Sequence, residues 1–233
     1  KIYDQEVNLC DSVNKIRVYS PKRVYNKMPA ILFFHQGGLV LFDHLTNDHF
    51  CSLLSKICNA KVISLNYRRC PEVNFPQPIE DCLNLWNYIQ SNSEIYGIDQ
   101  NRVALAGDSA GGLISLTLSV ELKFKKIKPI AVCVAYPWVT TSMENQNSLI
   151  TCANTFPLSR ETVDFFRQTV FPNEINVNHK WANPLAREDL TDLPPMIIAT
   201  AGFDPIRDQG NLFAEKIKKN GNIVKHFFFK NLS

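Results

Sequence analysis

The feature that most constrains this chain is an apolar stretch at residues 102–107, which runs through Gly-Asp-Ser-Ala-Gly-Gly, residues 107–112, into a helical pattern. A serine on a sharp turn between a strand and a helix needs small residues two positions away on either side, because the strand and the helix pack closely there. Gly107 and Gly111 meet this requirement. The following helix directs unpaired N–H groups towards Ser109, where they can stabilise negative charge. The pattern predicts that Ser109 is a nucleophile.

Apolar, β-branched stretches of strand length alternate with helical patterns along most of the chain. Strands that stay apolar suit a parallel sheet covered on both faces. Two stretches with polar alternation come first and indicate an antiparallel hairpin at one edge. The sequence therefore predicts a single domain over residues 1–233, built on a mostly parallel, doubly wound α/β sheet. The expected strands are residues 1–9, 14–20, 30–35, 61–66, 102–107, 130–136, 196–201 and 223–229, and the expected helices are residues 47–59, 78–91, 111–124 and 208–220.

The alternation breaks between Pro137 and Pro194. This segment contains one clear helical pattern, with Ser159 as the N-cap and the last turn near Val170, and Asn- and Thr-rich loops flank it. We expect residues 138–193 to form a helical cap insertion over the carboxyl edge of the sheet.

Composition excludes several classes of protein. A chain with 45% hydrophobic and 20% charged residues is neither disordered nor a coiled coil, and a net charge of +3 is too small to predict binding to nucleic acid. No apolar stretch reaches the ~20 residues that span a bilayer. Seven cysteines without a CxxC pair predict neither a zinc site nor a disulfide framework, which favours a cytoplasmic location. We expect no metal and no organic cofactor.

Glycines between a strand and a helix can also cradle a phosphate, but those at residues 107–112 lack the G-x-G-x-x-G spacing and the lysine of a P-loop. Dinucleotide binding is therefore disfavoured.

Glu80 and Asp81 fall in the first turn of a helix that starts near Pro78, which favours a helix-dipole or ion-pair role over acid–base catalysis.

A second glycine motif, His35-Gln36-Gly37-Gly38, follows the strand expected at residues 30–35. Together with Gly-Asp-Ser-Ala-Gly-Gly, it resembles the hormone-sensitive-lipase-like branch of the α/β hydrolases, which includes carboxylesterases and arylacetamide deacetylases. The resemblance covers nearly the whole chain from residue 30. It also includes Asn66-Tyr67-Arg68, Pro71-Glu72, Phe75-Pro76, Glu80-Asp81, Tyr136-Pro137-Trp138, Asn183-Pro184-Leu185, Leu193-Pro194-Pro195 and Ala201-Gly202-Phe203-Asp204-Pro205.

The resemblance implies an α/β-hydrolase fold and assigns site residues. The oxyanion hole would consist of the N–H groups of Gly37, Gly38 and Ala110. The first glycine of the family's loop is Gln36 here, so a requirement for positive φ at that position would change the loop. His35 is a structural loop residue in this family.

The acid of the catalytic triad should follow a late strand, because α/β hydrolases order the triad as serine, acid, histidine. Asp204 follows the strand expected at residues 196–201 and is assigned this role. Asp208 is the competitor, and its place just before a helix predicts an N-cap instead.

None of the five histidines suits the role of the catalytic base. His35, His44 and His49 precede the nucleophile, His179 lies in the cap, and His226 lies inside the last strand. In the family the histidine follows that strand, so we expect it just after Ser233. We accordingly expect an amino-terminal cap segment and a carboxyl-terminal histidine and helix to be missing, and the 233-residue chain to be inactive alone.

The resulting prediction is a serine hydrolase of the carboxylesterase or lipase-like type, which cleaves small-molecule esters of short to medium acyl chain through an acyl-enzyme. The alternatives are a non-catalytic, hydrolase-like small-molecule receptor and an amidase or deacetylase. The oligomeric state stays open, a homodimer included. The expected pocket walls are Phe34, Trp138, Phe156 and Phe203.

Overall fold

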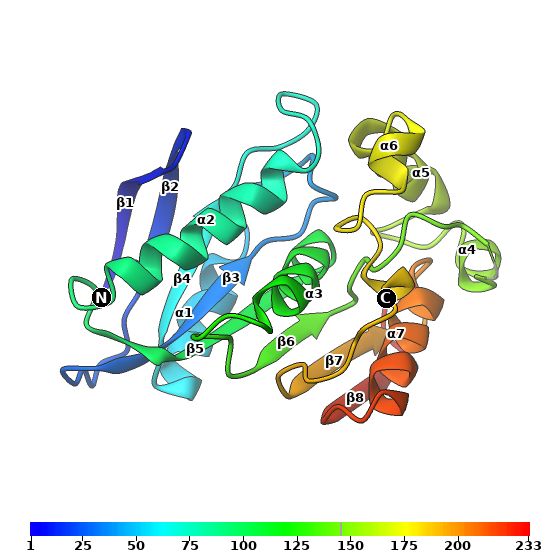
Figure 1. Ribbon diagram of the computed structural model, residues 1–233. Helices are drawn as coiled ribbons and strands as arrows, with labels where there is room; N and C mark the ends of the chain where they lie inside the picture. The colour runs from blue at the N-terminus through cyan, green and yellow to red at the C-terminus, as the bar shows by residue number, and fades with distance from the viewer. Residues whose placement is uncertain (145) are drawn as a thin grey trace.

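The computed structural model describes residues 1–144 and 146–233, and within these ranges eight strands form a sheet in the order β1-β2-β4-β3-β5-β6-β7-β8 (Figure 1). β1 pairs with β2 and β2 with β4 in antiparallel fashion, and the other pairs are parallel. The predicted doubly wound, mostly parallel α/β sheet is therefore confirmed. The strands are β1 (Ile2–Leu9), β2 (Ser12–Tyr19), β3 (Met28–Phe34), β4 (Lys61–Asn66), β5 (Ile98–Asp108), β6 (Val132–Ala135), β7 (Met196–Ala201) and β8 (Val224–Phe229).

Helices cover both faces of the sheet. α1 (Asp48–Cys58) packs against β4, while α3 (Ala110–Leu122) packs against β5 and α7 (Arg207–Lys219) against β7. Figure 1 shows α2 (Gln77–Ser91), α3 and α7 on the near face and α1 behind the sheet. Because a central strand meets a helix layer on each side, all of β3 except Pro29 is buried.

The amino-terminal hairpin lies at the edge of the sheet, as predicted. β1 and β2 pair from Ile2 opposite Tyr19 to Leu9 opposite Ser12. Burial alternates along most of β1, as expected for a strand with one face towards solvent.

Most element ends shift by one or more residues from the sequence prediction, and two of the differences have a clear structural cause. β5 begins at Ile98, because Ile98 pairs with Met28 before a register shift, and the exposed polar residues that follow it hid this part of the strand. Asp208 is not the N-cap of α7, since the helix begins at Arg207. Its carboxylate instead accepts a hydrogen bond from the backbone N–H of Ser148 (2.7 Å) and pairs with Arg207 (2.9 Å).

The helix that follows Ser109 is the most deeply buried element. Every residue of α3 except Glu121 is buried, so its small and polar side chains must find partners within the protein. The Ser115 hydroxyl donates to the Gly111 carbonyl (2.9 Å), and the Thr117 hydroxyl donates to the Trp181 carbonyl (3.1 Å). These hydrogen bonds satisfy the hydroxyl groups of Ser115 and Thr117, so the helix can lie buried at the centre of the domain although its sequence is not entirely apolar.

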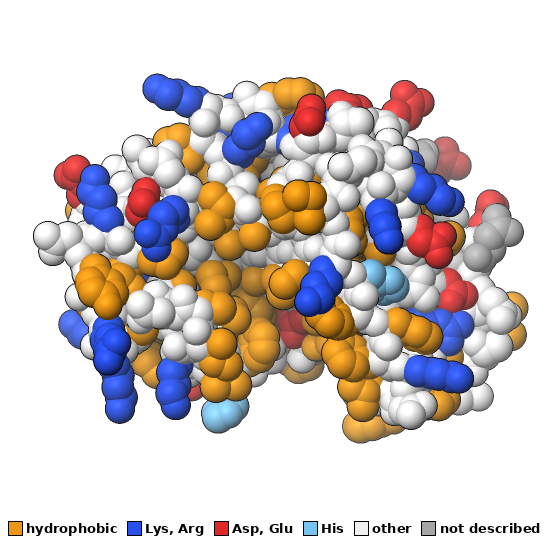
Figure 2. Space-filling model, turned by 90° about the horizontal axis from the view of Figure 1, so that it is seen from below, with side chains coloured by type: hydrophobic (Ala, Val, Ile, Leu, Met, Phe, Trp, Pro, Cys, Tyr) orange, Lys and Arg blue, Asp and Glu red, His pale blue; other side chains and the backbone are white. Residues whose placement is uncertain are grey.

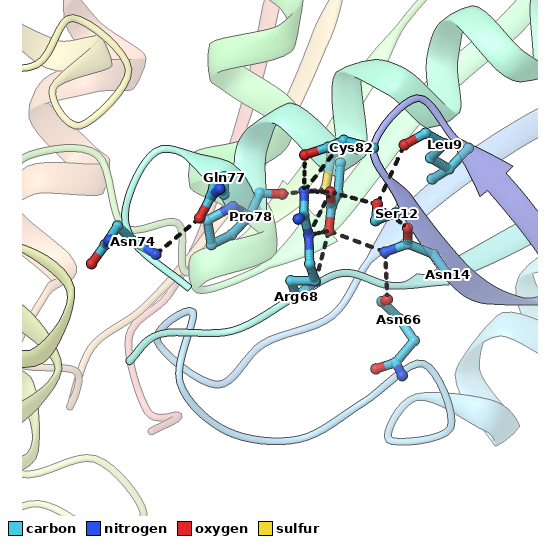
Figure 3. Close-up of polar contacts among 11 residues, drawn as sticks. Leu9, Ser12, Asn14, Asn66, Arg68, Asn74, Gln77, Pro78 and Cys82 are labelled. Atoms are coloured by element: carbon cyan, nitrogen blue, oxygen red, sulfur yellow. Dashed lines mark hydrogen bonds and ion pairs between the residues drawn. The ribbon is translucent and has the colours of Figure 1, made fainter. Parts of the chain in front are cut away.

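A buried carboxylate connects α2 to the antiparallel edge of the sheet (Figure 3). Asp81 is fully buried and accepts hydrogen bonds from the Arg68 guanidinium (2.6 Å), the Arg68 backbone N–H (2.9 Å) and the Asn14 amide (3.0 Å). Figure 3 shows the side chains of Ser12, Asn14 and Arg68 converging there. The ion-pair role predicted for Asp81 is therefore correct, and Glu80 lies in the first turn of α2.

The segment expected to form the cap carries short helices separated by loops. They are α4 (Ser148–Thr151), α5 (Arg160–Val170), α6 (Glu174–Val177) and the 3-10 turn η1 (Pro184–Ala186). Ser159 is the N-cap of α5 and accepts a hydrogen bond from the Thr162 N–H (3.2 Å), as predicted. In Figure 1 α4, α5 and α6 lie beyond the carboxyl ends of the parallel strands.

One face of the sheet is partly open between α1 and the edge strand β8. The register places Ile197, Phe227 and Phe229 on the same face, and these side chains are 39–48% exposed. Figure 2 shows hydrophobic side chains gathered around a hollow on the side seen from below.

Candidate active site

Ser109 lies on a strained turn between β5 and α3. Its φ of 52° and ψ of −114° place a side-chain-bearing residue in backbone space that is normally avoided. The turn is fixed from both sides, because the Ser109 N–H donates to the Ala135 carbonyl (3.0 Å) and its carbonyl accepts from the Trp138 N–H (3.1 Å). The half-buried side chain of Ser109 faces a cavity at the carboxyl edge of the sheet.

The glycines beside Ser109 are required by close backbone contacts. An ideal Cβ on Gly107 would lie 2.4 Å from the Gly111 carbonyl oxygen. An ideal Cβ on Gly111 would lie 1.8 Å from the Phe34 carbonyl oxygen. Both distances are far below van der Waals contact, so the close packing that the sequence predicts around this turn is present.

The loop after β3 approaches Ser109 with two glycines in left-handed conformations. Gly37 has φ 118° and Gly38 has φ 63°, and a Cβ on Gly37 would lie 2.2 Å from the Leu41 carbonyl oxygen. Gln36 is not among the residues with positive φ. The residue that replaces the family's first glycine therefore needs no glycine-only conformation here.

The N–H groups assigned to the oxyanion hole are free in the described ranges 1–144 and 146–233. Neither Gly37, Gly38 nor Ala110 donates a backbone hydrogen bond there. Ala110 is the first residue of α3, so its N–H has no partner within the helix. The first turn of α3 also carries no acidic side chain that would oppose a developing anion.

Asp204 lies after β7 and lines the same cavity as Ser109. Its side chain is nearly buried, and one carboxylate oxygen accepts a hydrogen bond from the Ile206 N–H (2.9 Å). Burial raises the pKa of Asp204 to about 6, while the Ile206 N–H and the Arg207 charge act in the opposite direction. The structure thus brings Ser109, Asp204 and the glycine loop to one place.

Two cavities meet at Ser109. The outer one measures about 410 Å³, and the exposed side chains of Phe42, Phe156 and Phe203 line it. The inner one measures about 20 Å³, and its lining includes the buried residues Trp138, Val163 and Ile206. Ser109, Leu158 and Phe166 line both. The outer cavity is also lined by Gln36, Gly37, Leu41, Phe42, Tyr136, Phe156, Pro157, Thr162, Phe203, Asp204, Pro205 and Ser233, and the inner cavity by Gly38, Trp138, Val163 and Ile206.

The four expected pocket walls have different positions. Phe156 and Phe203 line the outer cavity and are well exposed, and Trp138 lines the inner one. Phe34 lines neither cavity, because its side chain is fully buried in the core while its carbonyl contacts Gly111. The expectation that Phe34 is a pocket wall is therefore wrong. The backbone of Phe34 packs against the turn that carries Ser109.

No histidine lines either cavity in the part of the chain that the structure describes. His35 is fully buried and stacks on Tyr67 with the ring centroids 4.1 Å apart, and burial lowers its pKa to about 4. It is thus a neutral packing residue. Of the others, His44 is buried beside Asp4, His49 is on α1, His179 contacts Phe75 and Trp181, and His226 contacts Thr200.

Sequence reasoning missed several residues of this site. Tyr136 lines the outer cavity and donates a hydrogen bond to Asp108 (3.2 Å), which also accepts one from Asn47 (2.9 Å). Burial raises the pKa of Asp108 to about 6. Phe42 and Phe166 were also missed. Nothing local in the sequence marks Phe42 or Phe166 as a cavity residue.

The described residues include no cluster of three or more His, Cys, Asp or Glu side chains that could hold a metal ion. Among the helices in the described ranges, none combines the length and the apolar character needed to cross a bilayer.

A serine on a strained strand-to-helix turn and a carboxylate after a later strand, both at the carboxyl edge of a mostly parallel sheet, are features of the α/β hydrolases. Comparison with known families agrees, since the family described as "alpha/beta hydrolase fold" matches residues 31–233. The chain belongs to this family, and within it to the hormone-sensitive-lipase-like branch.

Several relatives and structural neighbours are named as esterases. The chain is 32% identical over 219 residues to an arylesterase of Saccharolobus solfataricus, covering 94% of this chain and 71% of the relative. It is 31% identical to the carboxylic ester hydrolase LipN of Mycobacterium tuberculosis, covering 84% of this chain but 54% of the relative. The structure superimposes with a TM-score of 0.93 and 31% identity on the thermostable carboxylesterase EstE1 from a metagenomic library, covering 98% of this chain and 78% of the other.

Proposed function

We propose that this protein is a serine carboxylesterase that cleaves small-molecule esters through an acyl-enzyme. The observation that carries the proposal is the strained Ser109 turn, which shares a cavity with Asp204 beneath the glycine loop. The esterase names of the relatives favour ester hydrolysis over the receptor and amidase alternatives.

In the proposed reaction the Ser109 Oγ attacks the ester carbonyl, and the alcohol leaves to give an acyl-enzyme. The developing oxyanion accepts hydrogen bonds from the N–H groups of Gly37, Gly38 and Ala110, which donate no backbone hydrogen bond within the described residues and belong to two different elements, the loop after β3 and the start of α3. Water then releases the acid and restores Ser109.

The general base in this proposal is a histidine, with Asp204 holding its ring and stabilising the imidazolium. A histidine directly after Ser233 would be well placed, because Ser233 lines the outer cavity together with Asp204. The Phe203 N–H also donates to the Leu232 carbonyl (2.9 Å), which joins the loop after β8 to the loop that carries Asp204. An ionised Asp204 beside an imidazolium would lose its raised pKa, since the positive charge favours the carboxylate.

The remaining assignments are also proposals. Residues 138–193 act as the cap, with Phe156, Phe203 and Trp138 as pocket walls. A cytoplasmic location and the oligomeric state stay predictions.

The test is hydrolysis of p-nitrophenyl acetate by protein produced from the complete gene. Ser109→Ala should lower kcat/KM by ~10³-fold or more, because the nucleophile is lost. The matched control is Ser91→Ala, at an exposed serine on α2, which should leave the rate unchanged. Activity that survives Ser109→Ala would refute the proposed function.

A further inference from the structure

We propose that Phe166 on α5 limits the acyl group to acetyl, so that the substrates are acetate esters of bulky apolar alcohols. This inference rests on the proposed function and adds the substrate class and the residue that determines it.

The sizes of the two cavities carry the argument. An ester held with its carbonyl carbon at the Ser109 Oγ extends in two directions, and two cavities of about 410 Å³ and about 20 Å³ meet at that serine. A single water molecule needs a cavity volume of ~10–15 Å³, so the inner cavity has room for about one water molecule or one methyl group. Only one half of the ester can be large.

The order of the reaction decides which half enters the inner cavity. The alcohol must leave before water can attack the acyl-enzyme, so it needs the open side of the site. The acyl group stays bonded to Ser109 until the end and can occupy an inner cavity. The inner cavity therefore receives the methyl group of an acetyl. The outer cavity receives the alcohol, and the aromatic rings of Phe42, Phe156 and Phe203 suit an apolar or aryl group there.

Phe166 is the wall between the two cavities. It lines both of them, and its ring lies directly on the glycine loop, since an ideal Cβ on Gly38 would lie 2.3 Å from the ring. Trp138, the other aromatic residue of the inner cavity, is held in place by a hydrogen bond from its Nε1 to the Thr140 carbonyl (2.8 Å) and by packing on Phe171. The Phe166 side chain ends in a hydrocarbon ring, so its removal leaves no polar group unpaired.

The neighbouring Phe165 provides a matched control. It lies on the same helix, its ring centroid is 5.7 Å from that of Phe166, and it is 51% exposed and lines neither cavity. Phe165→Ala removes the same number of atoms without opening the inner cavity.

The experiment compares kcat/KM for p-nitrophenyl acetate, butyrate and hexanoate in the protein produced from its complete gene, in Phe166→Ala and in Phe165→Ala. The native protein should prefer acetate over butyrate by ~10-fold or more, because each methylene that does not fit a pocket costs a factor of this size. Phe166→Ala should reduce that preference by ~10-fold or more and admit hexanoate, whereas Phe165→Ala should keep the native preference. Phe166→Leu serves as a second variant if Phe166→Ala does not fold.

The outcomes separate the two proposals. Hydrolysis that depends on Ser109 but is equally fast for all three chain lengths, or an unchanged preference in a folded Phe166 variant, overturns the acetyl assignment alone. Faster hydrolysis of methyl hexanoate than of hexyl acetate, two esters of simple alkyl alcohols, would place the alcohol in the inner cavity and also overturn it. If none of these esters is hydrolysed in a way that depends on Ser109, the proposed function itself is refuted.

Discussion

The carbonyl oxygen of Phe34 occupies the place where a side chain on Gly111 would begin, 1.8 Å from its ideal Cβ. The end of β3 and the start of α3 thus touch backbone to backbone. Gly111→Ala should lower the free energy of unfolding by ~3 kcal/mol or more, because neither backbone can move without displacing the core. Urea unfolding followed by circular dichroism measures the effect.

The control for this variant is Gly221→Ala. Gly221 has φ 84° but nothing lies within 4 Å of its ideal Cβ, so an alanine there adds only backbone strain, about 1–2 kcal/mol. Equal losses for both variants would show that the contact with Phe34 is not what excludes a side chain at Gly111.

The backbone of Ser109 should be easier to maintain with glycine than with alanine. Because φ is 52° and ψ is −114°, Ser109→Gly relieves strain that Ser109→Ala keeps. We expect the glycine variant to be more stable than the alanine variant by about 1 kcal/mol, after the entropic cost of glycine, with both inactive. Thermal unfolding of the two proteins tests this, and an alanine variant of equal or higher stability would contradict it.

Asp81 should contribute strongly to stability. Asp81→Ala leaves the Asn14 amide and the Arg68 backbone N–H without their buried acceptor and Arg68 without its nearest charge, so we expect a loss of ~3 kcal/mol. Asp164→Ala, which breaks a partly exposed pair with Arg160 one helical turn away, should cost at most ~0.5 kcal/mol. Chemical denaturation compares them, and similar losses would argue against a structural role for the Asp81 cluster.

The buried carboxylate of Asp108 should make stability depend on pH. Its pKa in the folded protein, about 6, lies above the ordinary value of 3.8, so the folded state binds the proton more tightly than the unfolded state does. Stability is therefore lost as the pH rises from about 4 through 6, by up to ~3 kcal/mol. Asp108→Asn removes this loss, so its stability relative to the native protein should rise over that range. A difference that stays constant from pH 4 to pH 7 would contradict the raised pKa.

The turn around Ser109 could be predicted because its requirements are local. A strand, two glycines at fixed spacing and a helix follow one another directly, and the structure shows the contacts that demand them. The strand and helix pattern of the sheet was predictable for the same reason, since buried parallel strands are apolar throughout.

Only some walls of the cavities could be predicted: Trp138, Phe156 and Phe203 line a cavity, but other positions depend on packing between distant elements. A strand covered on both faces, such as β3, does not reveal which neighbour each side chain meets, and Phe34 therefore looked like a pocket residue although it lies in the core. Phe166 reaches Gly38 only through the packing of α5 over the sheet, which no local pattern encodes.

The contacts that exclude a side chain at Gly107 and Gly111 differ in kind from the contact that excludes one at Gly38. At Gly107 and Gly111 backbone meets backbone, so almost any substitution there displaces the main chain. At Gly38 the obstacle is a single side chain, supplied by a helix outside the sheet. On the proposed role of Phe166, single codon changes in α5 would give such a gene a new substrate range while Ser109 and Asp204 stay unaltered.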